Sequence, residues 1–192
     1  MSAVLEPVHR LSVDDVFKMM EAGVLSGEDR VELVDGILTD IATPGGQHSG
    51  AVAWLNEHFT RAATSGWEVR VQDVLFVPSG FLSPDLMLVP RESARIERAF
   101  AMLVVEVSHT TRRRDEAKVA LYAAARVPEY WRVDIEAAEV VVRRDPTADD
   151  YAHLRRFVPG EAITPPVDAP PVDVAALLGR WSGPPHVHGP FS

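Results

Sequence analysis

The run MLVVEV at residues 102–107 decides the fold, because five of its six residues are apolar and only Glu106 interrupts it. Such a run is typical of a strand that is covered on both faces. A second candidate strand, DLMLV at residues 85–89, begins with Asp85 directly after Pro84. If the two strands pair, their carboxylates converge at one end of a sheet. The sequence therefore predicts a buried sheet with an acidic edge.

Further helices and strands are expected on both sides of this pair, from apolar residues at helical spacing and from short alternating runs. Upstream, the expected elements are a helix at 12–23, a hairpin at 30–41, a helix at 47–64, a strand at 67–77 and a turn at 78–84. Downstream, they are a helix at 114–125, a strand at 130–134, an outer strand pair at 139–144 and 151–158, and a short helix at 174–178. Ser12 and Asp15 form a capping-box variant, and Asp35-Gly36 is a strong hairpin signal.

This order predicts an α/β sandwich with a mixed central sheet flanked by helices, preceded by an N-terminal helix and β-hairpin. The 192 residues suffice for one buried core, and we expect a single domain at 1–178. Five of the 15 prolines lie at 159–171, and residues 179–192 are expected to form a flexible tail.

Several function classes are excluded by what the chain lacks. Without cysteine there is no disulfide framework, zinc knuckle or thiol nucleophile. No P-loop, GxGxxG or GxSxG motif occurs, so the usual nucleotide-binding and hydrolase signatures are missing. No apolar run approaches the roughly 18 residues of a membrane span, and the first residues lack a secretory signal. The expectation is a cytoplasmic protein with no membrane partner.

The charge is unevenly distributed along the chain. The net charge is −9, and residues 1–90 carry 13 acidic against 5 basic residues. Residues 91–156 carry 12 acidic against 13 basic residues, including 12 of the 17 arginines. A general electrostatic attraction to nucleic acid is therefore absent, but a local basic face is compatible with the composition.

Lys118 stands out because the chain has only two lysines among its 19 basic residues. A lysine ammonium can shift its pKa, which a guanidinium cannot do, so a retained lysine can serve chemistry. Asp85, Glu106 and Lys118 would meet if the helix expected at 114–125 crosses the end of the sheet. Two carboxylates without clustered His suit Mg²⁺ or Mn²⁺. The alternative is a buried Glu106–Lys118 or Asp85–Arg ion pair without catalysis. Tyr122, one turn after Lys118, is expected mainly to pack.

Four stretches together resemble the Uma family: ELVDG at 32–36, SPDLMLV at 83–89, LVVEVS at 103–108 and RRRDEAKVALYAAARVPEYWRVD at 112–134. This family belongs to the PD-(D/E)XK superfamily of restriction-endonuclease-like proteins, and the resemblance covers about residues 11–178. It implies that Asp85 and Glu106 hold the metal together with the backbone carbonyl of Val107. The usual lysine position is Ser108 here, so the resemblance passes the lysine role to Lys118.

The same resemblance implies two further site residues, Glu32 and His48, each of which can equally be structural. The implied function is a Mg²⁺-dependent endonuclease, with Mn²⁺ as a substitute, that hydrolyses DNA phosphodiester bonds with a metal-activated water. A homodimer is expected because duplex cleavage commonly uses two symmetric sites. The alternative is a catalytically silent DNA-binding or assembly module on the same fold.

Overall fold

The computed structural model describes residues 9–63, 66–92, 100–108 and 112–179, with backbone only for 112–117. Its centre is a six-stranded sheet with the strand order β10-β9-β8-β7-β6-β3. The strands are β3 (Trp67–Arg70), β6 (Leu86–Pro90), β7 (Leu103–Ser108), β8 (Glu129–Asp134), β9 (Glu139–Pro146) and β10 (Tyr151–Phe157). The β7–β8 pair is parallel and the other pairs are antiparallel, so the predicted mixed sheet is confirmed.

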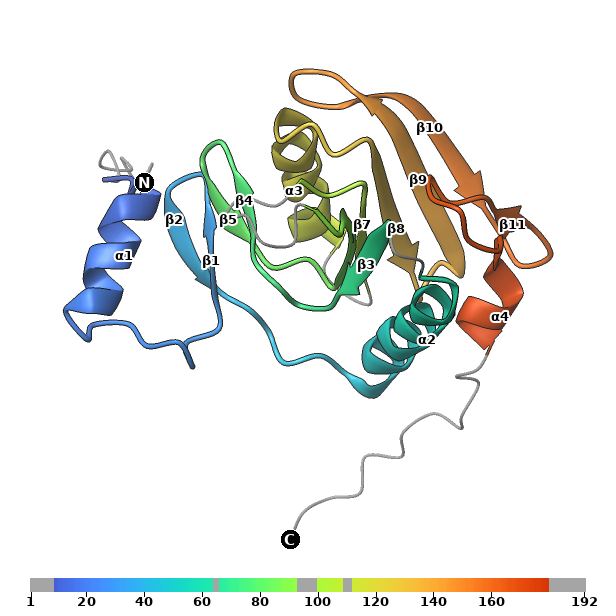
Figure 1. Ribbon diagram of the computed structural model, residues 1–192, viewed down its shortest axis with the longest axis horizontal. Coiled ribbons are helices and arrows are strands. Elements are labelled where there is room, and N and C mark those ends of the chain that lie inside the picture. Colours follow the sequence, from blue (N-terminus) through green and yellow to red (C-terminus); the bar gives the residue numbers. More distant parts are fainter. Residues whose placement is uncertain (1–8, 64–65, 93–99, 109–111, 180–192) are drawn as a thin grey trace, which may run out of the picture.

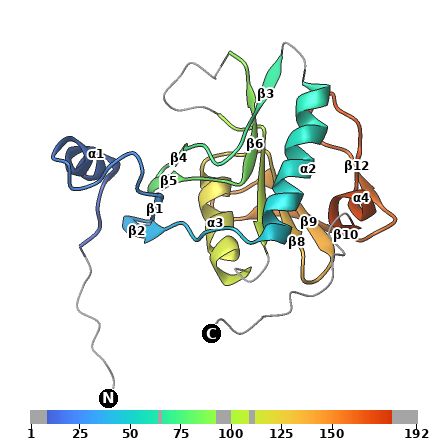
Figure 2. The same cartoon turned by 90° about the horizontal axis from the view of Figure 1, so that it is seen from below.

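Helices cover both faces of this sheet (Figures 1 and 2). Helix α2 (Gly46–Ala62) and helix α4 (Val174–Gly179) pack on one face, where Phe59 and Trp131 lie in the same apolar cluster. Helix α3 (Arg112–Ala124) packs on the other face, where Ala123 and Tyr130 belong to a second cluster. All six residues of β7 and of β8 are buried, as expected of central strands covered on both sides.

The N-terminal part forms a third layer, a four-stranded sheet in the order β2-β1-β5-β4. Its strands are β1 (Val31–Val34), β2 (Ile37–Asp40), β4 (Leu75–Val77) and β5 (Gly80–Leu82), and helix α1 (Val13–Glu21) lies on its outer side (Figure 1). Asp35 and Gly36 both have positive φ, 48° and 76°, which is the two-residue hairpin turn that the sequence predicts. The capping box of Ser12 and Asp15 is also present.

Two boundaries differ from the sequence prediction. The expected strand at 67–77 is split into β3 and β4, which belong to different sheets, and Gln72 between them has a φ of 51°. The expected turn at 78–84 contains β5, which pairs with β1. Gly80 makes this pairing possible, because a Cβ there would lie 1.8 Å from the carbonyl oxygen of Leu33. A local pattern cannot show that a strand changes sheets.

The C-terminal part returns to the six-stranded sheet. Two short strands, β11 (Ala162–Ile163) and β12 (Val172–Asp173), pair with each other ahead of α4, the short helix that the sequence predicts. These two strands were not predicted, because a proline-rich composition is typical of a loop. The flexible tail expected at 179–192 lies outside the described residues from position 180 on. No helix in the described ranges is long and apolar enough to cross a membrane.

A buried carboxylate ties this C-terminal part to the core. Glu129 is 4% exposed and accepts a hydrogen bond of 2.6 Å from the indole N–H of Trp131. Arg144 donates to both carboxylate oxygens of Glu129, at 2.8 and 2.9 Å, and also to the carbonyl of Thr164. This fork geometry is the strong form of an ion pair, and it holds the segment after β10 against β9.

We expect Glu129→Gln to lower the free energy of unfolding by about 1–3 kcal/mol, because it removes a buried charged acceptor from Arg144 and Trp131. Urea unfolding measures the change. Glu57→Gln is the control, since Glu57 pairs with Arg61 on the exposed face of α2 and such pairs contribute about 0–1 kcal/mol. Equal effects of the two substitutions would contradict this role of Glu129.

Candidate active site

Strand pairing brings Asp85 and Glu106 to the same end of the sheet. In the β6–β7 register Leu86 lies opposite Val105, so the next pair in that register is Asp85 and Glu106. The backbone N–H of Val107 donates a hydrogen bond of 2.8 Å to Oδ2 of Asp85. The convergence expected from the sequence is therefore present.

Lys118 lies between two buried carboxylates. Its Nζ is 2.8 Å from Oε1 of Glu32 and 3.1 Å from Oε1 of Glu106. The three residues come from β1, β7 and α3, and each is at most 6% exposed. Glu32 also accepts a hydrogen bond of 2.9 Å from the backbone N–H of Ser83. The N-terminal sheet thus contributes a side chain to the end of the central sheet.

His48 approaches the same region from the first turn of α2. Its Nε2 is 2.9 Å from Oδ2 of Asp85, and the two side chains are 15% and 13% exposed. Oδ2 of Asp85 therefore has two partners, the His48 ring and the Val107 N–H. The structure brings all the sequence-predicted site residues together at one end of the central sheet.

The protonation state of Lys118 follows from its surroundings. Burial alone lowers the pKa of a lysine, but the negative charges of Glu106 and Glu32 outweigh this effect and raise the pKa of Lys118 above its usual value. Lys118 therefore stays a cation over the whole physiological range. A second buried cation, Arg132 on β8, lies opposite Glu106 in the β7–β8 register.

The donor set fits a hard divalent cation. The candidate ligands are carboxylate oxygens of Asp85 and Glu106, together with a backbone carbonyl. The N–H and C=O of one strand residue point to the same edge, so the Val107 carbonyl faces the Asp85 side, as its N–H does. No group of three or more His, Cys, Asp or Glu side chains among the described residues is arranged to hold a metal. Proteins usually bind Mg²⁺ with one or two carboxylates, and water and substrate phosphate supply the remaining ligands.

Comparison with known proteins shows the family and the fold of the chain. The model of the family Uma2, described as "Putative restriction endonuclease", matches residues 14–176. The chain belongs to the Uma2 family. A solved structure of a putative nuclease belonging to DUF820 from Anabaena variabilis ATCC 29413 is similar with a TM-score of 0.71 and 14% identity, over 90% of this chain and 98% of that chain. The restriction-endonuclease-like fold expected from the sequence is thereby confirmed, and no curated protein matches significantly.

Tyr122 contacts the acidic site more directly than the sequence predicts. The hydroxyl of Tyr122 donates a hydrogen bond of 2.6 Å to Oε1 of Glu106, although packing was the expected role. The spacing of four residues from Lys118 places both side chains on one face of α3 and could have indicated this contact. No sequence pattern could have indicated the backbone N–H groups of Ser83 and Val107.

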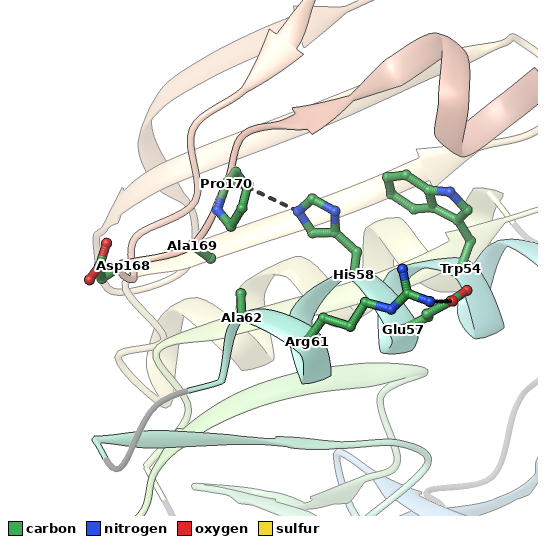
Figure 3. A pocket seen from close by; sticks show the side chains of 8 residues that line it. All are labelled: Trp54, Glu57, His58, Arg61, Ala62, Asp168, Ala169 and Pro170. Carbon is green, nitrogen blue, oxygen red and sulfur yellow. Dashed lines mark hydrogen bonds and ion pairs between the residues drawn. The ribbon is translucent and has the colours of Figure 1, made fainter.

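A separate groove of about 720 Å³ lies between α2 and the segment 168–170 (Figure 3). His58 and Trp54 stack in it with ring centroids 5.1 Å apart, and the His58 ring lies 3.0 Å from the carbonyl of Pro170. None of the residues that line this groove belongs to the acidic site. The groove therefore adds nothing to the chemistry at Asp85 and Glu106.

We expect Lys118→Met to lower the free energy of unfolding by about 3 kcal/mol near neutral pH, because Glu32 and Glu106 are left buried without their counter-charge. A carboxyl group that is buried without a counter-charge favours its protonated form. The loss of stability should therefore shrink as the pH falls.

Urea unfolding at several pH values measures this effect. The only other lysine, Lys18, lies exposed on α1, and Lys18→Met is the matched control. If both substitutions left the free energy of unfolding and its pH dependence unchanged, the Lys118 ion pairs would not contribute to the stability of the fold.

Proposed function

We propose that this protein is a Mg²⁺-dependent endonuclease that hydrolyses DNA phosphodiester bonds, with Mn²⁺ as a working substitute. The observation that carries the proposal is the position of Asp85 and Glu106 at one end of two paired strands, with the Lys118 ammonium 3.1 Å from Glu106. Membership of the Uma2 family supports a nuclease. Two carboxylates can hold a metal that activates water, and a lysine beside them can stabilise the negative charge that develops on the phosphate.

Asp85, Glu106 and the Val107 carbonyl would hold the cation. A divalent ion there supplies activation of water and neutralisation of phosphate charge. Asp85 Oδ2 is oriented by the Val107 N–H and by His48, which leaves this carboxylate fixed toward the strand end.

Lys118 would act on the reacting groups. Its ammonium stays protonated, so it can orient the attacking water and stabilise the negative charge that develops on the phosphate. Glu32 would hold Lys118 in place through the contact of 2.8 Å, and Ser83 in turn fixes Glu32. The N-terminal sheet would thus be part of the catalytic apparatus.

DNA is the proposed substrate, and the cytoplasm is the proposed location. The overall charge of −9 argues against broad electrostatic attraction to the phosphate backbone. The 12 arginines at residues 91–156 are the candidates for phosphate contacts, in a segment that also carries 12 acidic residues. We therefore expect binding that depends on site geometry more than on net charge.

Substitution of Asp85 tests the proposal directly. Asp85→Asn keeps an acceptor for the Val107 N–H but removes the negative charge, so Mg²⁺-dependent cleavage of plasmid DNA should fall by more than ~100-fold without loss of the fold. Asp73→Asn is the matched control, because Asp73 is 48% exposed and its partners, Arg70 and the backbone N–H of Val74, lie outside the acidic site. Calorimetric titration with Mg²⁺ and Mn²⁺ should show binding to the wild type and to Asp73→Asn, but not to Asp85→Asn.

Unchanged cleavage by Asp85→Asn would overturn the metal assignment. If the wild type bound DNA equally with and without Mg²⁺ and cleaved none of several substrates, the protein would be a silent DNA-binding or assembly module.

A homodimer would present two such sites to the two strands of a duplex. Light scattering should then give a mass about twice the 21.1 kDa of one chain. A monomer at the concentrations used for cleavage would exclude this assembly.

A further inference from the structure

The hydroxyl of Tyr122 has a defined task at the acidic site. It donates a hydrogen bond of 2.6 Å to Oε1 of Glu106, the same oxygen that lies 3.1 Å from the Lys118 Nζ. Tyr122 is 0% exposed, so water does not compete for its hydroxyl. A phenolic hydroxyl is protonated at neutral pH and can therefore donate to a carboxylate.

The carboxylate of Glu106 needs such a donor. The terminal torsion of a glutamate is broad and roughly two-fold, so the side chain itself does not set the plane of the carboxylate. Lys118 and Tyr122 lie on successive turns of α3 and donate to the same oxygen from two directions. The Lys118 ammonium and the Tyr122 hydroxyl together hold this oxygen in place, so loss of the hydroxyl weakens the constraint on the carboxylate.

We infer that Tyr122 is a positioning residue, whose hydroxyl orients the Glu106 carboxylate toward the cation and thereby sets metal affinity and turnover. This inference rests on the proposed function. Residues that orient a metal ligand typically contribute 10- to 100-fold in metal affinity or activity when they are removed.

Packing alone does not account for the hydroxyl. The ring of Tyr122 stacks on that of Tyr130 with centroids 5.4 Å apart, and Tyr130 stacks on Tyr151 at 6.3 Å. The Tyr151 hydroxyl is also buried, but it has no hydrogen-bond partner among the described residues. The aromatic stack therefore accepts a tyrosine without using its hydroxyl, and the short bond to Glu106 is specific to Tyr122.

The test compares Tyr122→Phe with Tyr151→Phe. Both substitutions keep the stacked ring and remove only one buried hydroxyl, but only the first touches Glu106. We expect Tyr122→Phe to weaken Mn²⁺ binding about 10-fold in calorimetric titration and to lower kcat about 10- to 100-fold. The KM for DNA should stay unchanged, and a higher Mn²⁺ concentration should restore part of the rate. Tyr151→Phe should behave as the wild type in every measurement.

Two results would overturn the inference. Wild-type metal affinity and kcat in Tyr122→Phe would show that the hydroxyl serves packing alone, and tighter metal binding would show that it competes with the cation. If Tyr122→Phe and Tyr151→Phe lowered the thermal midpoint equally and bound metal with equal affinity, the Tyr122 hydroxyl would likewise serve packing alone. If the wild type neither bound metal nor cleaved DNA, the proposed function itself would fail, which is distinct from an active wild type with an unaffected Tyr122→Phe.

Discussion

The ammonium of Lys118, shared between the buried carboxylates of Glu32 and Glu106, is the interaction on which the rest of the structure depends. Each carboxylate is costly to bury alone, and the ammonium is costly to bury without them. Together they satisfy one another at 2.8 and 3.1 Å. Because the three groups come from β1, β7 and α3, the cluster exists only when the N-terminal sheet, the central sheet and the helix are all in place.

This dependence joins stability to the proposed chemistry. Glu106 takes part both in the buried ion pair with Lys118 and in the proposed metal site. Asp85 adds a further negative group at the same strand end and is held by a backbone N–H and by His48. Ionisable groups gathered in this way at one strand end are candidates for a functional site.

The sequence was informative where local chemistry decides the structure. The capping box at Ser12, the turn at Asp35-Gly36 and the apolar run before Glu106 depend on neighbouring residues, and the structure contains all three features. It was uninformative where distant segments meet. The split between β3 and β4 follows from a change of sheet, and β5 forms only because the backbone of Leu33 approaches Gly80 closely.

The same division holds for the acidic site. The sequence by itself determined which groups are available: two acids on neighbouring strands, one lysine on the following helix, and the family pattern that adds Glu32 and His48. Only the tertiary structure decided which atoms meet, including the Tyr122 hydroxyl on Glu106 and the Val107 N–H on Asp85. The physical reason is that periodicity defines the face on which a side chain lies, whereas the crossing of α3 over β7 and the β6–β7 register define its partner.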